Sequence, residues 1–215
     1  MDQSGSDTQV GYDRVAEQYA TEFCDELKRK PFDCERLDAF AGSVRGQGLV
    51  YDVGCGPGHV ARYLKDRGLD MCGLDLSAEM VKVASRLNPD IPFEQGDMSA
   101  LKMADDSLAG AVLFYSIIHI EREAVTGVLQ EIKRVLHPSG QLLLGFHGGS
   151  EIVHRDEWYG QPVSIDFRLF QGEEMAGYLK AAGFENVTTM QRDPYKFEYP
   201  TRRFYVLASK ACAAL

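Results

Sequence analysis

The sequence predicts an α/β fold in which a mostly parallel sheet carries helices on both faces. Two observations indicate it. From residue 49 onward, short apolar segments alternate with amphipathic helical ones, and a glycine-rich turn follows the first apolar segment. The chain of 215 residues, 45% of them hydrophobic, is long enough for one domain with a full core, so we expect a single domain over 1–215.

The N-terminal residues 1–47 are expected to form a helical cap. An apolar stripe with a spacing of four residues predicts the first helix, and it consists of Val15, Tyr19, Phe23 and Leu27. Pro31 interrupts this pattern, because proline lacks the amide that an interior helical position needs. A second, shorter helix is expected from about Asp33 to Val44.

Residues 48–146 are expected to form the core of the sheet. Near-continuous apolar runs are typical of strands buried in a parallel sheet, and they occur at 49–53, 70–75, 91–97, 108–116 and 141–147. Helices are expected between them, over 59–68, 78–87 and 122–140. Ser77 supplies a capping hydroxyl for the second of these helices, and Pro138 and Gly140 mark the end of the third.

The remaining chain divides into an irregular insert at 147–171 and a closing helix with two strands at 172–215. The insert has no clean period, but "SIDFRLF" (164–170) alternates and predicts one extra strand. That strand would put Asp166 and Arg168 on one face. The closing helix is expected over 172–184, and the last strands over 184–193 and 202–210.

Charge and cysteine usage restrict the partners. The formal net charge is −9, and a surface of that sign repels phosphate backbones, so we expect no nucleic acid partner. No apolar run is long enough to cross a membrane, so no membrane partner is expected. The five cysteines form no CxxC pair and the N-terminus is polar and acidic, which favours a cytoplasmic protein with reduced thiols.

The turn after the first strand reads Gly54-Cys55-Gly56-Pro57-Gly58-His59. Glycines there permit positive φ and let backbone N–H groups touch a ligand directly. A nicotinamide dinucleotide fingerprint requires G-x-G-x-x-G, but here the third glycine comes one position early and His59 stands in its place. No GK[ST] follows, so a P-loop is also disfavoured.

Two carboxylates stand at the ends of the next strands. Asp75 ends "GLD", where an acidic residue is placed to accept the two ribose hydroxyls of an adenosine. Asp97 ends the third strand, where its carboxylate would receive the exocyclic amine of an adenine. The carboxyl ends of parallel strands meet at one edge of the sheet, so these groups and the glycine turn would face one crevice.

In this order, "YDVGCGPGHVARYL", "GLDLSAEMV" and "QGDM" resemble the motifs of the class I S-adenosylmethionine-dependent methyltransferases. The similarity extends to "LFYSIIHI" and "EIKRVLHPSGQLLLGF", and covers roughly 49–146 in detail. The resemblance implies a Rossmann-like sheet of seven strands whose last strand is antiparallel. It also implies S-adenosyl-L-methionine as the cofactor, with S-adenosyl-L-homocysteine as its product.

The resemblance further implies a set of cofactor-binding residues. Asp52 and the turn residues Gly54, Cys55, Gly56 and Gly58 would hold the methionine moiety, Asp75 with Leu76 the ribose, Met80, Gly96, Asp97 and Met98 the adenine, and Tyr115 and Ser116 would approach the sulfonium. "YDRVAEQYA" (12–20) resembles the lid helix of the family, so Tyr12 and Tyr19 are candidates to close over the cofactor. Tyr19 also belongs to the apolar stripe of the first helix, and both interpretations stay open.

Methyl transfer requires a base only when the acceptor loses a proton, and histidine suits that role near neutral pH. His119 follows the fourth strand and His147 ends the fifth, so both lie at the ligand edge and are our candidate catalytic residues. A structural hydrogen bond is an equally good explanation for each.

The insert holds the candidate acceptor-binding residues His154, Trp158, Asp166 and Arg168. An aromatic pocket with a few charges suits a small acceptor, although Asp166 and Arg168 would also fit an internal ion pair on a solvated strand. The spacing of His147, His154 and Asp156 matches no recognised metal site, so no metal is expected.

The sequence therefore predicts methyl transfer to a small-molecule acceptor, most readily at oxygen or nitrogen. The signature of enzymes that methylate amino groups of nucleobases is missing, since the matching place reads "FYSIIHI". Two alternatives remain: a cofactor-binding regulator or scaffold without catalysis, and a methyltransferase acting on RNA or protein. A monomer or homodimer is expected.

Overall fold

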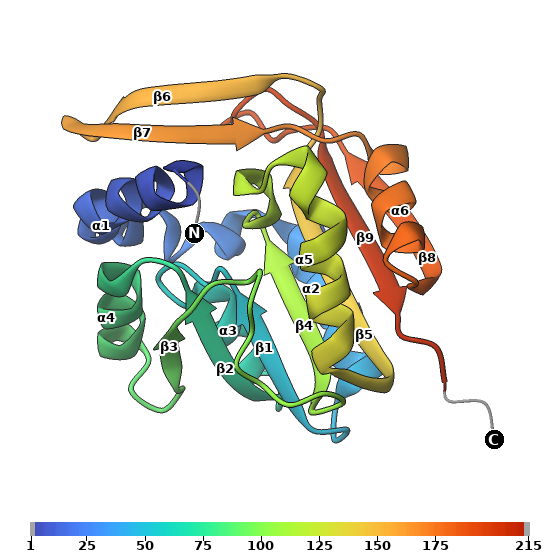
Figure 1. Ribbon diagram of the computed structural model, residues 1–215. Helices are drawn as coiled ribbons and strands as arrows, with labels where there is room; N and C mark the ends of the chain where they lie inside the picture. The colour runs from blue at the N-terminus through green and yellow to red at the C-terminus, as the bar shows by residue number, and fades with distance from the viewer. Residues whose placement is uncertain (1–2, 213–215) are drawn as a thin grey trace.

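The computed structural model describes residues 3–212, so the outer ends of the expected segments 1–47 and 172–215 lie outside the described residues. A seven-stranded sheet runs through the molecule (Figure 1) in the order β3-β2-β1-β4-β5-β9-β8. Its strands are β1 (Leu49–Val53), β2 (Asp70–Asp75), β3 (Phe93–Gln95), β4 (Leu108–Phe114), β5 (Leu136–His147), β8 (Glu185–Arg192) and β9 (Arg203–Ser209). The pairs among β1 to β5 are parallel, whereas β9 is antiparallel to both neighbours. The predicted fold class is confirmed.

The strand order reverses between β1 and β4. From β1 the chain adds β2 and β3 on one side, then returns and adds β4 and β5 on the other. Every residue of β4 is buried, because β4 lies in the middle of the sheet with helices on both faces. Ligands of such sheets bind at the carboxyl ends of the strands beside this reversal, so the fold itself defines where a site is built.

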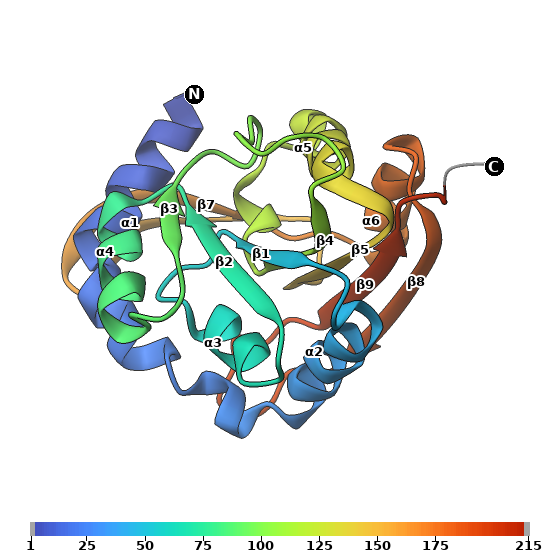
Figure 2. The same cartoon turned by 90° about the horizontal axis from the view of Figure 1, so that it is seen from below.

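Helices cover both faces of the sheet (Figure 2). One apolar core joins α2 (Pro31–Val44) and α3 (His59–Lys65) to the sheet, with Phe40 and Leu64 among its buried residues. The other joins α5 (Arg122–Val135) and α6 (Gly172–Ala181) to the opposite face, with Leu129 and Leu179 among its residues. α4 (Ala78–Leu87) packs against β3 and against the N-terminal helix α1.

The N-terminal cap begins with α1 (Gln3–Phe23), and a short 3₁₀ helix, η1 (Glu26–Arg29), precedes α2. Pro31 does separate the helices, but it occupies the first turn of α2, so α2 begins two residues before the expected Asp33. A proline is well tolerated there because the first helical amides have no intrahelical acceptor.

The insert is more regular than its sequence indicates. It forms a hairpin of β6 (Ile152–Trp158) and β7 (Gln161–Arg168), whereas the sequence analysis expected only one strand. β6 is exposed along most of its length, so it shows no apolar alternation. β7 packs on α1, and this contact is close: a Cβ on Gly11 would lie 2.6 Å from Ile165 Cδ1. The hairpin therefore lies over α1 (Figure 1).

Several expected boundaries were wrong, among them the following. The expected strand over 91–97 is paired only at Phe93–Gln95. The helix expected over 122–140 ends at Val135, because Leu136 turns to an extended conformation and pairs with Leu108. The helix expected over 59–68 ends at Lys65. Within residues 3–212, no helix has the length and apolar character needed to cross a bilayer.

Candidate active site

The glycine turn follows β1, next to the point where the strand order of the sheet reverses. Gly54, Gly56 and Gly58 have φ values of 76°, 51° and 80°, which side chains rarely adopt. A Cβ on Gly54 would lie 2.9 Å from Ser116 Oγ and nearer still to Ser116 Cβ, so Gly54 lets β1 and β4 approach. Gly58 differs from the other two: a Cβ there would meet Phe93, and Gly58 is not among the residues that line the cavity described below. Packing explains the glycine at 58, which we had expected to hold the cofactor.

Asp75 connects this turn to the end of β2 through hydrogen bonds to backbone amides. Its Oδ2 accepts the amide of Gly56 at 2.7 Å, and its Oδ1 accepts the amide of Ser77 at 2.9 Å. Burial raises the pKa of Asp75 to about 6, and the two amide hydrogen bonds oppose that rise. At neutral pH the carboxylate is ionised, and each oxygen keeps lone-pair capacity for a further donor.

Asp52 lies beneath the turn and is almost fully buried. Its Oδ2 accepts the amide of Ala61 at 3.0 Å, in the first turn of α3. Burial raises the pKa of Asp52 to about 7. Asp52 and Asp75 thus differ, since Asp75 is the more fully ionised of the two at neutral pH.

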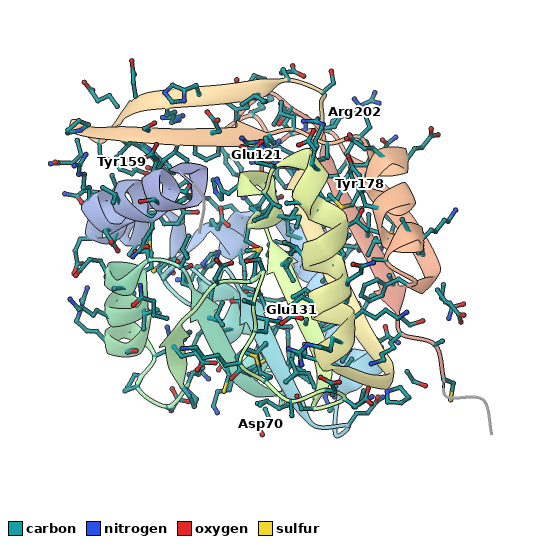
Figure 3. The ribbon with its side chains drawn as sticks, viewed as in Figure 1. Asp70, Glu121, Glu131, Tyr159, Tyr178 and Arg202 are labelled. Carbon is teal, nitrogen blue, oxygen red and sulfur yellow. The ribbon has the colours of Figure 1, made fainter. Side chains whose placement is uncertain are left out.

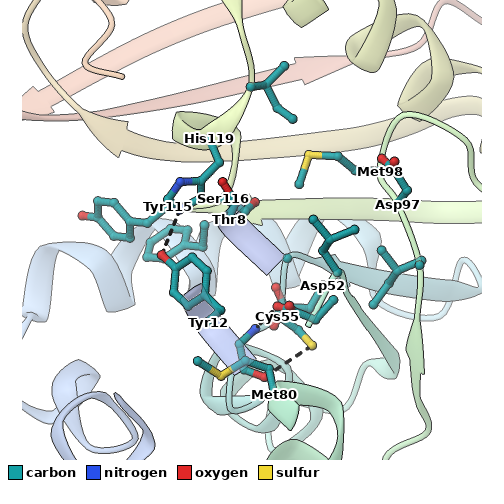
Figure 4. A pocket seen from close by; sticks show the side chains of 18 of the residues that line it. Thr8, Tyr12, Asp52, Cys55, Met80, Asp97, Met98, Tyr115, Ser116 and His119 are labelled. Carbon is teal, nitrogen blue, oxygen red and sulfur yellow. Dashed lines mark hydrogen bonds between the residues drawn. The ribbon is translucent and has the colours of Figure 1, made fainter. Parts of the chain in front are cut away.

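A cavity of about 300 Å³ lies at this edge of the sheet (Figure 4). Apart from Gly58, every residue proposed for the cofactor lines it, together with one candidate base: Tyr12, Tyr19, Asp52, Gly54, Cys55, Gly56, Asp75, Leu76, Met80, Gly96, Asp97, Met98, Tyr115, Ser116 and His119. Gly5, Thr8 and His59 also line it, and the sequence analysis did not assign them to the site.

These residues fit an adenosyl amino acid. The positive-φ turn exposes backbone, a half-buried carboxylate with spare lone pairs lies next to it, and the apolar side chains of Leu74, Met80 and Met98 also line the cavity. The cavity volume falls at the lower end of the range of roughly 300–1,000 Å³ that is typical of small-molecule sites.

Tyr12 and His119 form a hydrogen-bonded pair at the edge of the cavity (Figure 4), with 2.9 Å between Tyr12 Oη and His119 Nε2. His119 Nδ1 lies 3.0 Å from the backbone oxygen of Asp166, which can only accept. The imidazole proton therefore resides on Nδ1, and Nε2 accepts from the tyrosine hydroxyl. Burial lowers the pKa of His119 to about 4, so the ring is neutral at physiological pH.

A second cavity, of about 430 Å³, lies beside the first and is enclosed by α1, η1, the hairpin and the 197–203 segment. The two cavities share Tyr12, Tyr19 and Tyr115. One end of the second cavity is aromatic and includes Trp158, Tyr159 and Phe167, and the other end holds His147 with several charged groups. Tyr159 reaches from the hairpin towards α1 (Figure 3), where its hydroxyl donates to Glu22.

The four candidate acceptor residues do not all line a cavity. Trp158 lines the second cavity, but His154, Asp166 and Arg168 line neither cavity. The exposed His154 lies 2.7 Å from Asp166 Oδ1. Arg168 is buried and pairs with Asp166 at 3.3 Å and with Glu121, which lies below the hairpin (Figure 3). The side chains of these three residues form ion pairs within the hairpin and with Glu121, and only the backbone of Asp166 reaches the site, through His119.

The sequence analysis missed a buried ionic cluster at the charged end. Lys30 Nζ lies 2.7 Å from Glu26 and 3.2 Å from Glu198, and Arg203 lies 3.8 Å from Glu198. Glu26 also lies 3.2 Å from His59, which lines the first cavity. These residues are far apart in sequence, and the only available signal was the concentration of charge in "ELKRK" and "EYPTRR".

Residues 50–140 match the family described as "Methyltransferase domain". The demethylmenaquinone methyltransferase of Renibacterium salmoninarum is 37% identical over 103 residues, which are 48% of this chain and 42% of that protein. The malonyl-[acyl-carrier protein] O-methyltransferase of Enterobacter lignolyticus is 34% identical over 120 residues, which are 54% of this chain and 45% of that protein. The chain therefore spans less than half the length of these curated relatives.

The fold is also that of solved structures. The DhpI–SAH complex superimposes with a TM-score of 0.75 at 21% identity, covering 96% of this chain and 97% of DhpI. The likeness extends beyond the matched domain to the N-terminal cap and the closing strands. The domain match over residues 50–140, the similar sequences and the strand order agree, and they support a class I, Rossmann-like S-adenosylmethionine-dependent methyltransferase.

Proposed function

We propose that this protein transfers the methyl group of S-adenosylmethionine to a small-molecule acceptor, at oxygen or nitrogen, by in-line displacement. The observation that carries the proposal is the pair of neighbouring cavities with a common wall of Tyr12, Tyr19 and Tyr115. One cavity has the groups that suit an adenosyl amino acid, and the other has room for an acceptor. Holding two reactants in line contributes on the order of 7–11 kcal/mol to catalysis.

When bound, S-adenosylmethionine supplies a methyl group that is already activated on a sulfonium. Asp75 would accept the ribose hydroxyls, the amides of the Gly54–Gly56 turn would hold the amino-acid end, and Met80 and Met98 would enclose the adenine. The aromatic residues of the shared wall would exclude water from the space between the reactants.

Where the acceptor loses a proton, the Tyr12–His119 pair gives that proton a path. Tyr12 Oη would take the proton of the acceptor while its own hydroxyl proton moves to His119 Nε2, which already accepts its hydrogen bond. The backbone oxygen of Asp166, on the other ring nitrogen, would stabilise the imidazolium that results.

The acceptor class rests on the shape and charge of the second cavity. Its walls enclose a small volume, and the chain carries a net charge of −9, which disfavours an RNA substrate. The relatives are named for demethylmenaquinone and for O-methylation of malonyl-[acyl-carrier protein], and these names support neither a nucleobase nor a single acceptor. All five cysteines are unpaired, which suits the cytoplasm, where we place the protein as a monomer or homodimer.

The test uses the small-molecule fraction and the macromolecular fraction of an extract of the source cells as separate acceptor pools. Each is incubated with the protein and S-adenosylmethionine, and S-adenosylhomocysteine formation is measured. We expect formation with the small-molecule fraction only, with a methylated compound detected by mass spectrometry. Formation with the macromolecular fraction alone, or cofactor binding without turnover in either pool, would contradict the proposal in favour of a macromolecular substrate or a non-catalytic binder.

A further inference from the structure

We propose that the acceptor carries an anionic oxygen group, such as a carboxylate, which binds at Lys30 and His147, while a planar ring lies against Trp158. This inference rests on the proposed function, because it concerns the cavity assigned to the acceptor. It follows from which hydrogen-bonding groups of that cavity are already engaged and which are free.

The carboxylates of the charged end are engaged. Glu198 accepts two hydrogen bonds from Arg192, at 2.6 and 2.9 Å, one from the Tyr195 amide at 2.8 Å, and an ion pair from Lys30. Glu26 accepts from Lys30 through one oxygen and from His59 through the other. Both oxygens of each carboxylate thus have donors, and neither is available as the main partner of a cationic acceptor.

Lys30 retains a donor. Its ammonium has three N–H groups: one donates to Glu26, the ammonium also forms an ion pair with Glu198 at 3.2 Å, and no further acceptor within residues 3–212 engages it. The ammonium also lies 5.4 Å from the centre of the Tyr115 ring, in the wall that both cavities share. The free N–H of Lys30 is therefore available to a ligand in the second cavity, close to the wall shared with the first cavity.

His147 presents a second donor. Arg203 Nη1 donates to Thr201 Oγ1 at 2.8 Å, so the proton of that hydroxyl is free to be donated to His147 Nδ1, 2.9 Å away. The imidazole proton then resides on Nε2, which has no hydrogen-bond partner within the described part of the chain. Burial, and the nearby charges of Arg203 and Lys30, lower the pKa of His147 to about 3 and keep the ring neutral. In this tautomer His147 offers an N–H to the cavity.

The charge of the lining agrees with this assignment. Four cationic side chains face three carboxylates along the second cavity, although the chain as a whole is acidic: Arg29, Lys30, Arg155 and Arg203 against Glu22, Glu26 and Glu198. An anion is thus attracted to this cavity while the outer surface repels it. At the opposite end the lining is aromatic: Trp158 and Tyr159 stack with 5.4 Å between ring centres, Tyr12 and Tyr19 contact Trp158 edge-on, and Arg155 lies over the Trp158 ring. This end of the cavity suits an aromatic ring.

The experiment compares four probes that carry the same phenyl ring and different polar groups: benzoate, benzamide, benzylamine and phenyl phosphate. Each is titrated by calorimetry into the protein saturated with S-adenosylhomocysteine. We expect benzoate to bind at least about tenfold more tightly than benzamide, as for a charged hydrogen bond, and benzylamine to bind more weakly than either. Tighter binding of phenyl phosphate than of benzoate would identify the anionic group as a phosphate. Equal affinities for benzoate and benzamide, or preference for benzylamine, would overturn the inference.

The variant His147→Phe keeps an aromatic ring but removes the donor. We expect it to lose about tenfold in benzoate affinity while its affinities for benzamide and S-adenosylhomocysteine stay unchanged. His154→Phe, on the exposed face of the hairpin, is the matched control and should bind all probes as the wild type does. Unchanged benzoate binding in His147→Phe would contradict the assignment.

These binding results are independent of turnover. If benzoate is not preferred but neutral small molecules are methylated, only this inference fails. If benzoate is preferred but no fraction yields S-adenosylhomocysteine, the proposed function fails while the binding assignment stands.

Discussion

The two cavities are built from different parts of the chain. The cofactor cavity is centred on the parallel core: the turn after β1, the ends of β2 and β4, and one carboxylate that accepts two amides line it. The acceptor cavity is lined mainly by side chains from α1, η1, the β6–β7 hairpin and the 197–203 segment, and the sheet core adds Tyr115 after β4 and His147 at the end of β5. The first is a consequence of the fold, and the second is an addition to it.

This difference explains how one fold serves many acceptors. The turn after β1 and the adjoining strand ends tolerate few substitutions, because their shape depends on glycine conformations and on the spacing of the strands. Side chains on a hairpin and a cap change without disturbing the sheet. We therefore expect substitutions on the cofactor side to affect binding or stability directly, and substitutions on the acceptor side to affect turnover.

The largest effect is expected from Asp75→Ala. The variant loses the acceptor of the Gly56 and Ser77 amides as well as that of the ribose hydroxyls, so S-adenosylhomocysteine affinity should fall by about 3 kcal/mol, which is about 100-fold. Calorimetric titration measures it. Asp70→Ala, at the opposite end of β2 (Figure 3), is the control and should bind normally. Wild-type affinity in Asp75→Ala would show that the ribose is held elsewhere.

Tyr12→Phe tests the acceptor side. Removing the hydroxyl leaves the ring in the shared wall but breaks the path to His119, so turnover should fall about 100-fold for an acceptor that loses a proton. S-adenosylhomocysteine affinity should change little. His119→Ala should behave in the same way, and Tyr178→Phe, whose hydroxyl bonds Glu174 on α6, serves as the control. Unaltered rates in both site variants would exclude the pair from proton transfer.

Two glycines of the turn provide an internal contrast. Gly54→Ala would force Ser116 away from the turn and disturb its 2.7 Å hydrogen bond to the Val53 carbonyl, so thermal unfolding should show a loss of about 2 kcal/mol. Gly56→Ala meets only Tyr19, at 3.8 Å, and should cost about 1 kcal/mol of backbone strain. Equal losses in the two variants would mean that close approach to Ser116 does not determine the glycine at 54.

The smallest effect is a pH dependence of cofactor binding. The pKa of Asp75 is about 6, above its ordinary value, so the carboxylate is ionised above pH 6 and gains a proton as the pH falls through that value. A protonated oxygen accepts less well, so S-adenosylhomocysteine affinity should fall by up to about tenfold per pH unit below pH 6. In Asp75→Asn this slope should vanish, and any change that persists near pH 7 belongs to Asp52. A wild-type profile that is flat from pH 5 to 7 would contradict the assignment.

The sequence predicted the cofactor side because its signals are local. An apolar strand, a glycine turn and an acid at the next strand end lie within 49–75, and parallel pairing brings the strand ends together without further information. The close packing around Gly58 could not be predicted from the local sequence, because it involves Phe93 and Asn88, which lie elsewhere in the sequence.

The acceptor side depends on long-range contacts. Lys30 and Glu198 form an ion pair although they lie far apart in the sequence, and no short sequence pattern predicts this contact. The sequence predicted that His119 and His147 lie near strand ends, but it did not predict which hydrogen bonds their rings form. Those roles depend on the Asp166 carbonyl and on Thr201, which a linear pattern does not connect to the strand ends.

The most direct test is a calorimetric titration of the wild-type protein with S-adenosylhomocysteine and, in parallel, with NAD. If the turn at Gly54–Gly56 and the Asp75 carboxylate form a site for an adenosyl amino acid, S-adenosylhomocysteine should bind to one site per chain and NAD should give no heat of binding. Tight binding of NAD, with none of S-adenosylhomocysteine, would contradict the account.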